Sequence, residues 1–248
     1  MKIKCLACDA LARLVYLSAA HSPHIVDVTL LQLGLHNQPA NLRKRLQAEI
    51  DSASGQGYQA VVLGYALCGR ATEGLVAREV PVILPRAHDC ITLFLGSRLL
   101  YTQEHDSVPG TYWYALDFIE RNDMTGGNFI LGSEDLIQPV YEEYVKKYGK
   151  DNADYLMEVM GAWKNNYERA VYIEMGVGDG QAVEQRARNE ASRRGWAFER
   201  RMGDLRLIHK LLAGEWDEDM LVVQPGQRIS MSMDENIICA EEKIEIQP

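Results

Sequence analysis

Short apolar runs alternate with amphipathic, helix-like segments along most of the chain. The run at residues 60–65 reads AVVLGY, and the segment before it has Leu42, Leu46 and Ile50 at the four-residue spacing of one helix face. Strands this apolar are buried on both faces, as in a parallel sheet that is covered by helices. The pattern therefore predicts an α/β fold with a Rossmann-like parallel sheet flanked by helices.

The expected strands and helices follow one another in turn. Strands are expected at residues 2–7, 26–33, 60–65, 80–84, 171–175, 196–201 and 220–224. Helices are expected at residues 10–18, from Pro39 to just before Gly55, and at 91–96, 138–148, 152–167, 181–194 and 205–213. Asp9 and Asp204 are expected to cap the helices that follow them. Residues 109–114 are rich in aromatic side chains and are expected to form a loop.

The alternation of strand and helix is interrupted between about residues 131 and 170. We therefore expect an N-terminal α/β lobe at 1–135 that contains the candidate site, a helical connection at 136–169, and a C-terminal α/β lobe with a tail at 170–248. The two halves form either two α/β lobes or one continuous sheet, and the pattern leaves both arrangements open.

The composition is that of an ordinary globular protein. Of the 248 residues, 47% are hydrophobic and 25% are charged. A chain of this length buries roughly 70–75% of its unfolded surface and needs no metal ion merely to fold, so a metal site would serve function. The net charge is −9 and no concentrated basic stripe is present. Nucleic acid is therefore not an expected partner, because binding it needs clustered Lys and Arg.

No stretch approaches the ~18 consecutive apolar residues of a membrane span, and the apolar stretch at the N-terminus is too short for a signal peptide. We therefore expect a cytoplasmic protein without a membrane partner. Its five cysteines would then be thiols, metal ligands or catalysts rather than structural disulfides.

Residues suited to metal chemistry follow four successive predicted strands. Cys8 follows the first strand, His36 the second and Cys68 the third, while His88 and Cys90 follow the fourth. Right-handed crossovers favour parallel order, and the carboxyl ends of parallel strands share the edge at which ligands bind. We therefore expect three cysteines and two histidines to converge on one crevice.

Thiolates and imidazoles suit zinc, iron–sulfur clusters or cobalt chemistry. Three thiolates, here Cys8, Cys68 and Cys90, can hold a [4Fe–4S] cluster or a zinc ion with one open coordination position. The fourth ligand or the acid–base group would be His36 or His88, and Arg86 would hold an anion. The alternative is that the cysteines only fill the core, because free cysteine is among the most buried residue types.

The other two cysteines are expected to have different roles. Cys5 has the opposite strand parity to Cys8 and should point to the other face of the sheet, into the core. Cys239 lies in a polar tail and is expected to be incidental. Alternatively, Cys5 and Cys8 could form a redox pair, although in thioredoxin-type pairs it is the first cysteine that begins the helix.

Glycine-containing segments could contact a ligand. Gly69 lies beside Cys68, and Gly110 with Thr111 could form a lid over the crevice, since long loops rarely lack a role. These three are the expected cofactor-binding residues, although a packed aromatic loop is the alternative for 110–112. Residues 176–180 (GVGDG) follow a strand and open a helix, either as a nucleotide loop or as a tight turn.

Several segments together resemble one family. They are LACDAL at residues 6–11, LHNQP at 35–39, GYALCG at 64–69, RAHDCI at 86–91 and PGTY at 109–112, with GDL at 203–205 and VQPG at 223–226. The set is similar to the landmarks of the prokaryotic domain of unknown function 1638 (DUF1638), over about residues 3–229. The resemblance implies cysteines at the positions of Cys8, Cys68 and Cys90 and does not demand Cys5. It also implies a setting in anaerobes, often beside corrinoid methyltransferase systems, and no settled reaction.

The candidate site supports three functional hypotheses. The first is a metalloprotein whose three-cysteine metal or iron–sulfur site handles a small molecule in anaerobic, corrinoid-linked one-carbon metabolism, as a metal-dependent transferase or lyase. The second is a nucleotide- or S-adenosylmethionine-dependent transferase that uses residues 176–180. The third is a non-enzymatic protein that delivers a metal or corrinoid cofactor to a corrinoid protein or methyltransferase. A homodimer is one open option for the oligomeric state.

Overall fold

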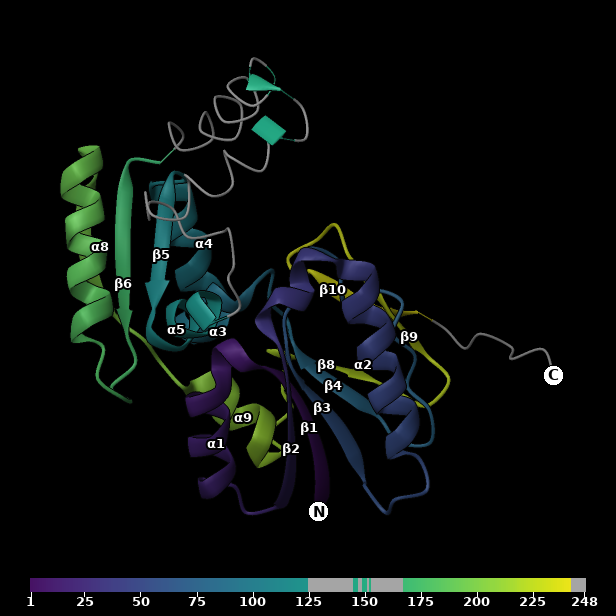
Figure 1. Cartoon of the computed structure of the whole chain (residues 1–248). Coiled ribbons are helices and arrows are strands. Elements are labelled where there is room, and N and C mark those ends of the chain that lie inside the picture. The colour runs from purple at the N-terminus through teal and green to yellow at the C-terminus, as the bar shows by residue number, and fades with distance from the viewer. Residues whose placement is uncertain (125–144, 147–148, 151, 153–166, 242–248) are drawn as a thin grey trace.

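The computed structural model contains a five-stranded sheet, four of whose strands come from the N-terminal half of the chain (Figure 1). Its strand order is β2–β1–β3–β4–β8, and β2, β1, β3 and β4 are parallel, as expected. Strand β8 differs because it enters at the carboxyl edge, where Met220 pairs with Pro85, and so it runs antiparallel to β4. The strands are β1 (Lys2–Cys8), β2 (Ile25–Leu31), β3 (Ala60–Gly64), β4 (Val82–Pro85) and β8 (Met220–Val223).

Helices cover both faces of this sheet, with α1 and α9 on one face and α2 on the other. Helix α2 begins at Pro39, whose fixed φ suits a first helical turn, and it buries the apolar face that the sequence spacing predicts. The helices are α1 (Ala12–His21), α2 (Pro39–Ala53), α3 (Cys90–Leu95), α4 (Arg98–Ser107) and α9 (Arg206–Ala213), with the 3-10 turns η1 (Asp9–Leu11) and η2 (Leu33–Asn37).

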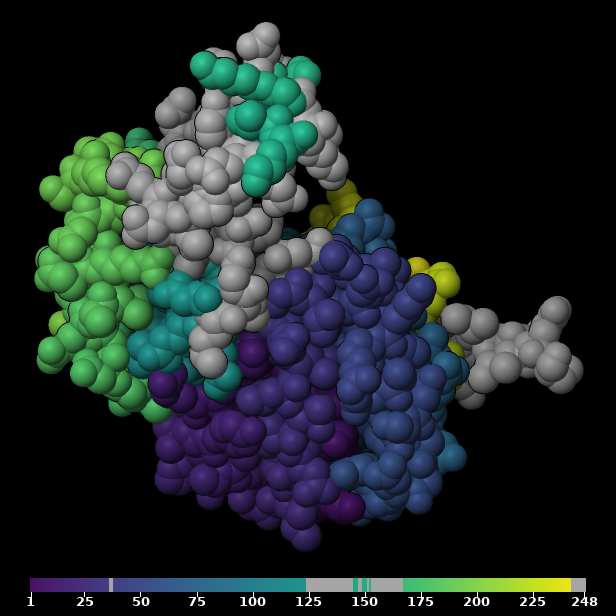
Figure 2. Space-filling model, in the orientation of Figure 1, coloured from purple at the N-terminus to yellow at the C-terminus, as the bar shows by residue number. Residues whose placement is uncertain are grey.

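A second, three-stranded parallel sheet lies beside the first, in the order β5–β6–β7. Helices α5 and α8 pack against it. Figure 2 shows the teal and green parts of the chain packed against the purple N-terminal part. An antiparallel pair, β9–β10, follows β8. These elements are β5 (Thr111–Ala115), α5 (Leu116–Met124), β6 (Arg169–Glu174), α8 (Gln181–Arg194), β7 (Ala197–Met202), β9 (Arg228–Met231) and β10 (Ile238–Glu241).

The carboxyl edges of the two parallel sheets face one another. Arg13, which follows β1, donates its backbone amide to Asp117 Oδ2 at 2.8 Å, and Asp117 follows β5. Past the end of β7, the amide of Asp204 donates to the carbonyl of Phe94 in α3 at 3.0 Å. Ligands of open α/β sheets bind at such edges, so both sheets contribute residues to the same region.

Each of the two expected α/β lobes contributes a strand to the sheet of the other lobe. Strand β5, within the expected lobe at 1–135, pairs with β6 of the second sheet, whereas β8, within the expected lobe at 170–248, pairs with β4 of the first. The chain therefore leaves the first sheet before β5 and returns to it after β7. The helices expected at 138–148 and 152–167, within the expected connection 136–169, lie largely outside the described residues.

The structure describes residues 1–124, 145–146, 149–150, 152 and 167–241, apart from the side chains of 36, 37 and 124. Within these residues, no helix combines the length and the apolar character that crossing a membrane requires.

Two local expectations are wrong. Residues 111–115 form strand β5 rather than an aromatic loop, because their side chains pack in the second sheet, where Tyr114 is 1% exposed. Asp9 does not cap the first helix. Strand β1 runs on to Cys8, Asp9 then begins η1, and its carboxylate accepts the amide of Leu33 instead.

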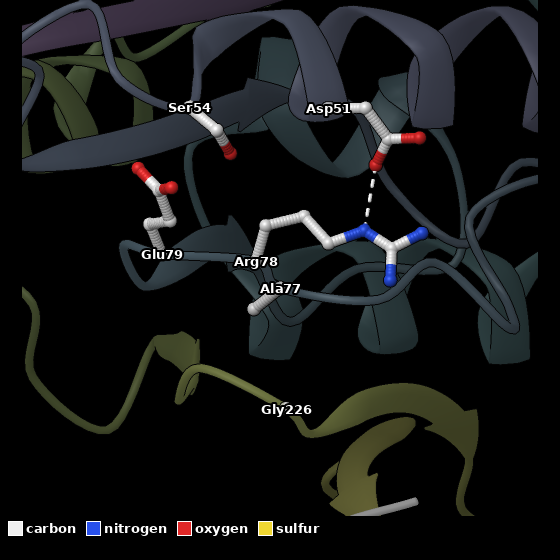
Figure 3. A pocket seen from close by; sticks show the side chains of 6 residues that line it. All are labelled: Asp51, Ser54, Ala77, Arg78, Glu79 and Gly226. Carbon is white, nitrogen blue, oxygen red and sulfur yellow. Dashed lines mark hydrogen bonds and ion pairs between the residues drawn. The ribbon is translucent and has the colours of Figure 1, made fainter. Parts of the chain in front are cut away.

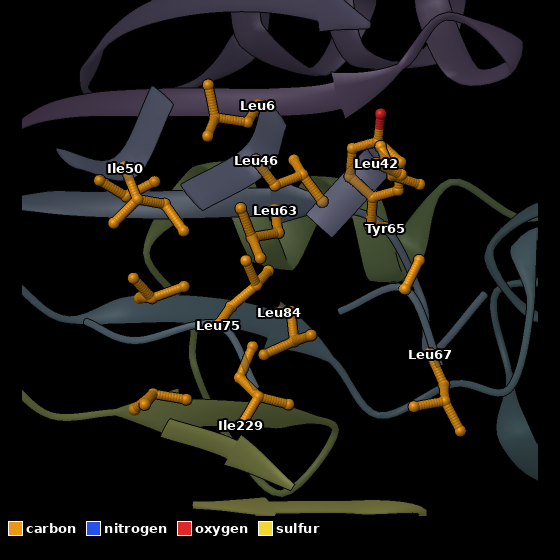
Figure 4. Close-up of a cluster of buried hydrophobic side chains, with 14 of the residues drawn as sticks. Leu6, Leu42, Leu46, Ile50, Leu63, Tyr65, Leu67, Leu75, Leu84 and Ile229 are labelled. Atoms are coloured by element: carbon orange, nitrogen blue, oxygen red, sulfur yellow. The ribbon is translucent and has the colours of Figure 1, made fainter. Parts of the chain in front are cut away.

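Two buried apolar clusters lie on opposite faces of the first sheet. Figure 4 shows the cluster beneath α2, in which Leu6, Leu63 and Leu84 from three neighbouring strands meet residues of the helix. Full burial of one such side chain contributes about 1.5–3 kcal/mol to folding. The sheet is thus a firm support for the residues at its carboxyl edge.

Candidate functional site

Three cysteines stand at the carboxyl ends of three neighbouring strands. Cys8 is the last residue of β1, Cys68 lies in the loop after β3, and Cys90 is the first residue of α3, which follows β4. Because β1, β3 and β4 are parallel and adjacent, these residues share one edge of the sheet, as the sequence predicts. Cys8 is buried, whereas Cys68 and Cys90 are partly exposed, so the group opens toward the surface.

Backbone hydrogen bonds extend the pairing of β3 and β4 beyond the sheet. The amide of Leu67 donates to the carbonyl of Ala87 at 2.9 Å, and the amide of Cys68 donates to the carbonyl of His88 at 3.0 Å. The segments that lead to Cys68 and Cys90 therefore run side by side.

The loop at Cys68 has an unusual backbone. Cys68, Gly69 and Arg70 are three consecutive residues in the left-handed region, with φ of 47°, 62° and 69°. Each non-glycine residue in this region costs on the order of 1 kcal/mol, and such residues cluster at functional sites. The side chain of Arg43 supports the loop by donating from Nη2 to the carbonyl of Arg70 at 2.6 Å. Gly69 is exposed beside Cys68.

The three thiols influence one another electrostatically. Burial raises the pKa of Cys8 and of Cys68 from 9.0 to about 12, and the nearby Cys68 adds to the rise at Cys8. Burial raises the pKa of Cys90 well above 9.0, and Asp89, Cys68 and Cys8 add to that rise. The three therefore lie in one neighbourhood and are neutral thiols at pH 7 in the absence of a cation.

The three cysteines lie near one another but are not arranged as a complete set of metal ligands. Within the part of the chain that the structure describes, no three His, Cys, Asp or Glu side chains are grouped closely enough to hold a metal ion as they stand. A metal ion bound by Cys8, Cys68 and Cys90 would have to draw them together.

A tyrosine that the sequence did not single out lies near two of the cysteines. Tyr65 is 2% exposed, and its hydroxyl has no hydrogen-bond partner among the described residues. Burial raises its pKa, and Cys8 and Cys68 raise it further. In Figure 4 the hydroxyl points away from the apolar cluster toward the end of β1. Buried hydroxyls are normally paired, so this one is a donor available beside the candidate site.

Two aspartates brace the chain next to the cysteines. Asp9 Oδ1 accepts the amide of Leu33 at 2.8 Å, which ties the end of β1 to η2. Asp89 caps α3 by accepting the amide of Ile91 at 3.0 Å, and its other oxygen accepts the hydroxyl of Tyr101 at 2.8 Å. Both contacts hold a cysteine-bearing junction in place.

The two expected histidines follow β2 and β4 at the same edge, with β1 and β3 between these strands. His36 lies in η2, directly after β2, and its side chain is outside what the structure describes. His88 is exposed, with its ring centroid 6.5 Å from that of Tyr101. Their roles as a fourth ligand or as acid–base groups stay predictions.

Arg86 is used elsewhere in the structure. Its Nη1 donates to the carbonyls of Ile238 and of Asn236, the latter at 3.3 Å, and so holds the ribbon that contains β10. Burial lowers its pKa, and the charge of Arg98 adds to this effect. Nη1 is thus engaged with backbone oxygens, and the role of Arg86 in holding an anion stays a prediction.

Gly110 and Thr111 are not brought to the cysteines. They lie at the amino end of β5, whereas it is the carboxyl end that leads into α5 and to the first sheet. Four strand residues separate the two ends by about 13 Å. The Gly110 carbonyl accepts the amide of Arg169, and Thr111 Oγ1 accepts Arg169 Nε at 2.9 Å. Their structural role is therefore to join β5 and β6.

The remaining cysteines, Cys5 and Cys239, do not belong to the candidate site. Cys5 is fully buried in the cluster beneath α1 and α9, while Cys8 belongs to the cluster beneath α2, which confirms that they point to opposite faces. Three strand residues span about 10 Å, too far for a disulfide, so the alternative of a redox pair is wrong. Cys239 lies in strand β10 rather than in a tail.

The glycine loop at 176–180 is filled by the protein itself. A Cβ at Gly178 would lie 2.7 Å from a methyl of Leu116 and 3.1 Å from Arg13, and one at Gly180 would collide with the hydroxyl of Tyr172. The amides of Gly176 and Gln181 donate to the carboxylates of Glu174 and Asp179. These features favour the tight-turn interpretation over a phosphate-binding loop.

An open pocket lies away from the cysteines. It has a volume of about 460 Å³ and is lined by residues at the end of α2, before β4 and after β8 (Figure 3). Its charged groups are paired, because Arg78 Nε lies 2.7 Å from Asp51 Oδ1 and Glu79 accepts the amide of Gly55. It lies at the opposite edge of the sheet and takes no part in the candidate site.

Comparison with known proteins identifies the family of this chain but does not assign it a function. The family described as "Protein of unknown function (DUF1638)" matches residues 30–212 of the 248-residue chain. No curated protein and no solved structure matches the chain. The matched range includes Cys68, Cys90 and the whole second sheet, whereas β1 with Cys8, most of β2, and β8 lie outside it. The chain belongs to the DUF1638 family.

Proposed function

We propose that this protein binds a thiophilic metal centre, a [4Fe–4S] cluster or a zinc ion, through Cys8, Cys68 and Cys90. The observation that supports the proposal is that three strand–helix junctions bring three thiols into one neighbourhood, where burial raises the pKa of all three, Cys68 raises that of Cys8, and Cys8 and Cys68 raise that of Cys90. A metal cation offsets this cost, because thiolates, not thiols, are the ligands.

The surroundings of the thiols fit such a group. The Tyr65 hydroxyl is buried near Cys8 and Cys68 and has no hydrogen-bond partner in the part of the chain that the structure describes, so it is free to donate to a group held there. Cys68 and Cys90 lie beyond the ends of β3 and β4, on a loop and at the first residue of a short helix. Drawing their sulfurs toward Cys8 therefore need not move these two strands.

When bound, a centre with three cysteine ligands supplies one open coordination position for a small molecule. His36 and His88 follow the second and fourth strands at this edge and would supply the fourth ligand or move a proton. We further propose a place in corrinoid-linked one-carbon metabolism, as an enzyme or as a protein that delivers its cofactor to a corrinoid protein or methyltransferase.

The test is anaerobic purification and reconstitution, followed by analysis of iron, labile sulfide and zinc and by a visible spectrum. We expect one centre per chain in the wild type, and loss of most of the metal in Cys8→Ser, Cys68→Ser and Cys90→Ser. Cys5→Ser and Cys239→Ser are the matched controls and should keep the metal. Wild-type protein that takes up neither metal nor cluster would overturn the proposal.

A further inference from the structure

Strand β2 forms one edge of the five-stranded sheet and has a row of backbone groups that face outward. The amide of Ile25 donates to the carbonyl of Met1, just before β1. Backbone groups alternate in direction along a strand, so the N–H and C=O groups of Val26, Val28 and Leu30 point away from β1. Among the described residues no strand pairs with this side of β2, which Figure 1 shows at the front of the sheet with α1 and α2 on either side.

Strand β2 lacks the features that usually protect an edge strand from pairing with another chain, namely charges, proline, a bulge or short length. Strand β7, an edge of the second sheet, has Glu199, Arg200 and Arg201, and β8, at the other edge of the first sheet, has only four residues. Strand β2 reads IVDVTLL, with seven residues in unbroken register and with Asp27 as its one charged side chain. It is therefore suited to adding a strand from a partner.

Exposed apolar side chains lie on the same side of the molecule. Ile25, at the start of β2, is 66% exposed, and Tyr16 of α1 is 54% exposed. Helix α9, which packs over β3 and β4, lies against the side of α1 that carries His21, because the rings of His21 and His209 are 6.4 Å apart. Tyr16 is about 140° around the helix from His21. It therefore lies on the side of α1 that faces away from α9 and toward the edge formed by β2.

We propose that β2 pairs with β2 of a second copy of this chain, antiparallel and about a twofold axis at Val28, so that one sheet runs through both copies. In this register Val28 faces Val28 of the second copy and Val26 faces its Leu30, so the outward N–H and C=O groups of these residues bond reciprocally. A twofold axis at Asp27 would instead place two carboxylates directly opposite each other, and like charges at opposite positions are destabilising.

The charges beside the strand are complementary in this register. Asp27 of one copy lies opposite Thr29 of the other, since the two positions are equally far from Val28. Within each copy Lys4 Nζ donates to Thr29 Oγ1 at 2.8 Å. The ammonium group of Lys4 in one copy therefore comes beside the Asp27 carboxylate of the other, which is 46% exposed in the single chain. Twofold symmetry makes this contact twice, and it favours a second copy of the chain over an unrelated strand.

Sedimentation velocity of the full chain over a range of protein concentrations tests the proposal. We expect the wild type to form a dimer of twice the chain mass of 28.0 kDa. Val28→Pro should raise the dissociation constant of the dimer by about 10- to 100-fold. The N–H group that proline lacks faces outward at this position, so the substitution removes no hydrogen bond within the chain. Ile25→Lys should weaken the dimer as well, and Leu99→Lys, at an apolar residue of α4 that is 76% exposed, is its matched control and should not.

Hydrogen exchange of the wild type locates the contact. The amides of Val26, Val28 and Leu30 should exchange more slowly as the protein concentration rises and the dimer forms. A wild type that stays monomeric up to its solubility limit overturns the proposal, and so does a dimer that Val28→Pro and Ile25→Lys leave as stable as the wild type. Circular dichroism confirms that each variant is folded, and the exposed position of Ile25 gives a second variant that does not disturb the core. Pairing of β2 does not depend on the metal centre.

Discussion

The backbone amide of Cys68 donates to the carbonyl of His88 at 3.0 Å, although the two residues follow different strands. This bond continues the register of β3 and β4 past the end of the sheet. The position of the Cys68 loop relative to the start of α3, and so to Cys90, is therefore set by backbone pairing rather than by side-chain packing. Substitution of the Cys68 or Cys90 side chain should therefore leave this backbone pairing intact.

Asp89 should matter for both the stability and the metal content of the protein. Asp89→Ala removes the cap of α3 and leaves the Tyr101 hydroxyl without its acceptor, so we expect unfolding to become easier by about 1–3 kcal/mol. Because Cys90 begins α3, metal occupancy should fall as well. Urea unfolding and metal analysis measure the two effects. Asp89→Asn is the control, since asparagine caps helices equally well, and an equal loss in both variants would contradict the capping role.

Tyr65→Phe should stabilise the metal-free protein. The substitution keeps the ring in the cluster beneath α2 and removes a buried hydroxyl that has no partner among the described residues. Relieving this desolvation cost should raise the free energy of unfolding by about 1 kcal/mol. Urea unfolding of the metal-free wild type and of the metal-free variant measures this difference in the free energy of unfolding. A variant that is less stable by about 1 kcal/mol would show that the hydroxyl is paired in solution.

Asp117 should couple the two sheets. Its carboxylate is 4% exposed and accepts both the backbone amide and Nη1 of Arg13. Asp117→Ala leaves that amide unpaired at the junction, so we expect a loss of about 2 kcal/mol in urea unfolding. Hydrogen exchange at the amide of Arg13 should quicken by roughly tenfold or more. Asp117→Asn keeps an acceptor and should retain most of the protection, and unchanged exchange in Asp117→Ala would refute the coupling.

The buried thiol of Cys5 should lower the free energy of unfolding at high pH. Burial raises the pKa of its thiol from 9.0 to about 12. Below pH 9 the thiol is protonated in both the folded and the unfolded state. Between pH 9 and 12 the unfolded state loses the proton first, so this residue lowers the free energy of unfolding by about 1.4 kcal/mol per pH unit.

Cys5→Ala isolates this effect from other groups that titrate at high pH. At pH 8 the variant should be less stable than the wild type by about 1–2 kcal/mol, because it leaves a small cavity. The gap should narrow or reverse as the pH rises from 9 to 11 in urea unfolding experiments. A gap that stays constant over this range would show that the thiol is not shielded from water.

The helices and strands were predictable where the apolar pattern was strong. The spacing of Leu42, Leu46 and Ile50 predicted α2, and the apolar run at 60–65 predicted β3, because each pattern fits one element alone. The prediction failed at Thr111–Ala115, where alternating aromatic residues resemble a loop until the partner strand β6 is known. The expectation that Asp9 caps the first helix failed for a similar reason, because Asp9 Oδ1 accepts the amide of Leu33, a residue distant in the sequence.

The sequence by itself determined the α/β class, the burial of Cys5 on the face opposite Cys8, and the common edge of Cys8, Cys68 and Cys90. These follow from strand periodicity and from parallel order, which are local or general properties of a chain. The tertiary structure alone decided that the second sheet faces this edge, that Arg86 holds the ribbon of β9 and β10, and that the buried Tyr65 hydroxyl lies near Cys8 and Cys68. Such contacts join segments far apart in the chain, and their partners depend on how complete elements pack, which no local pattern encodes.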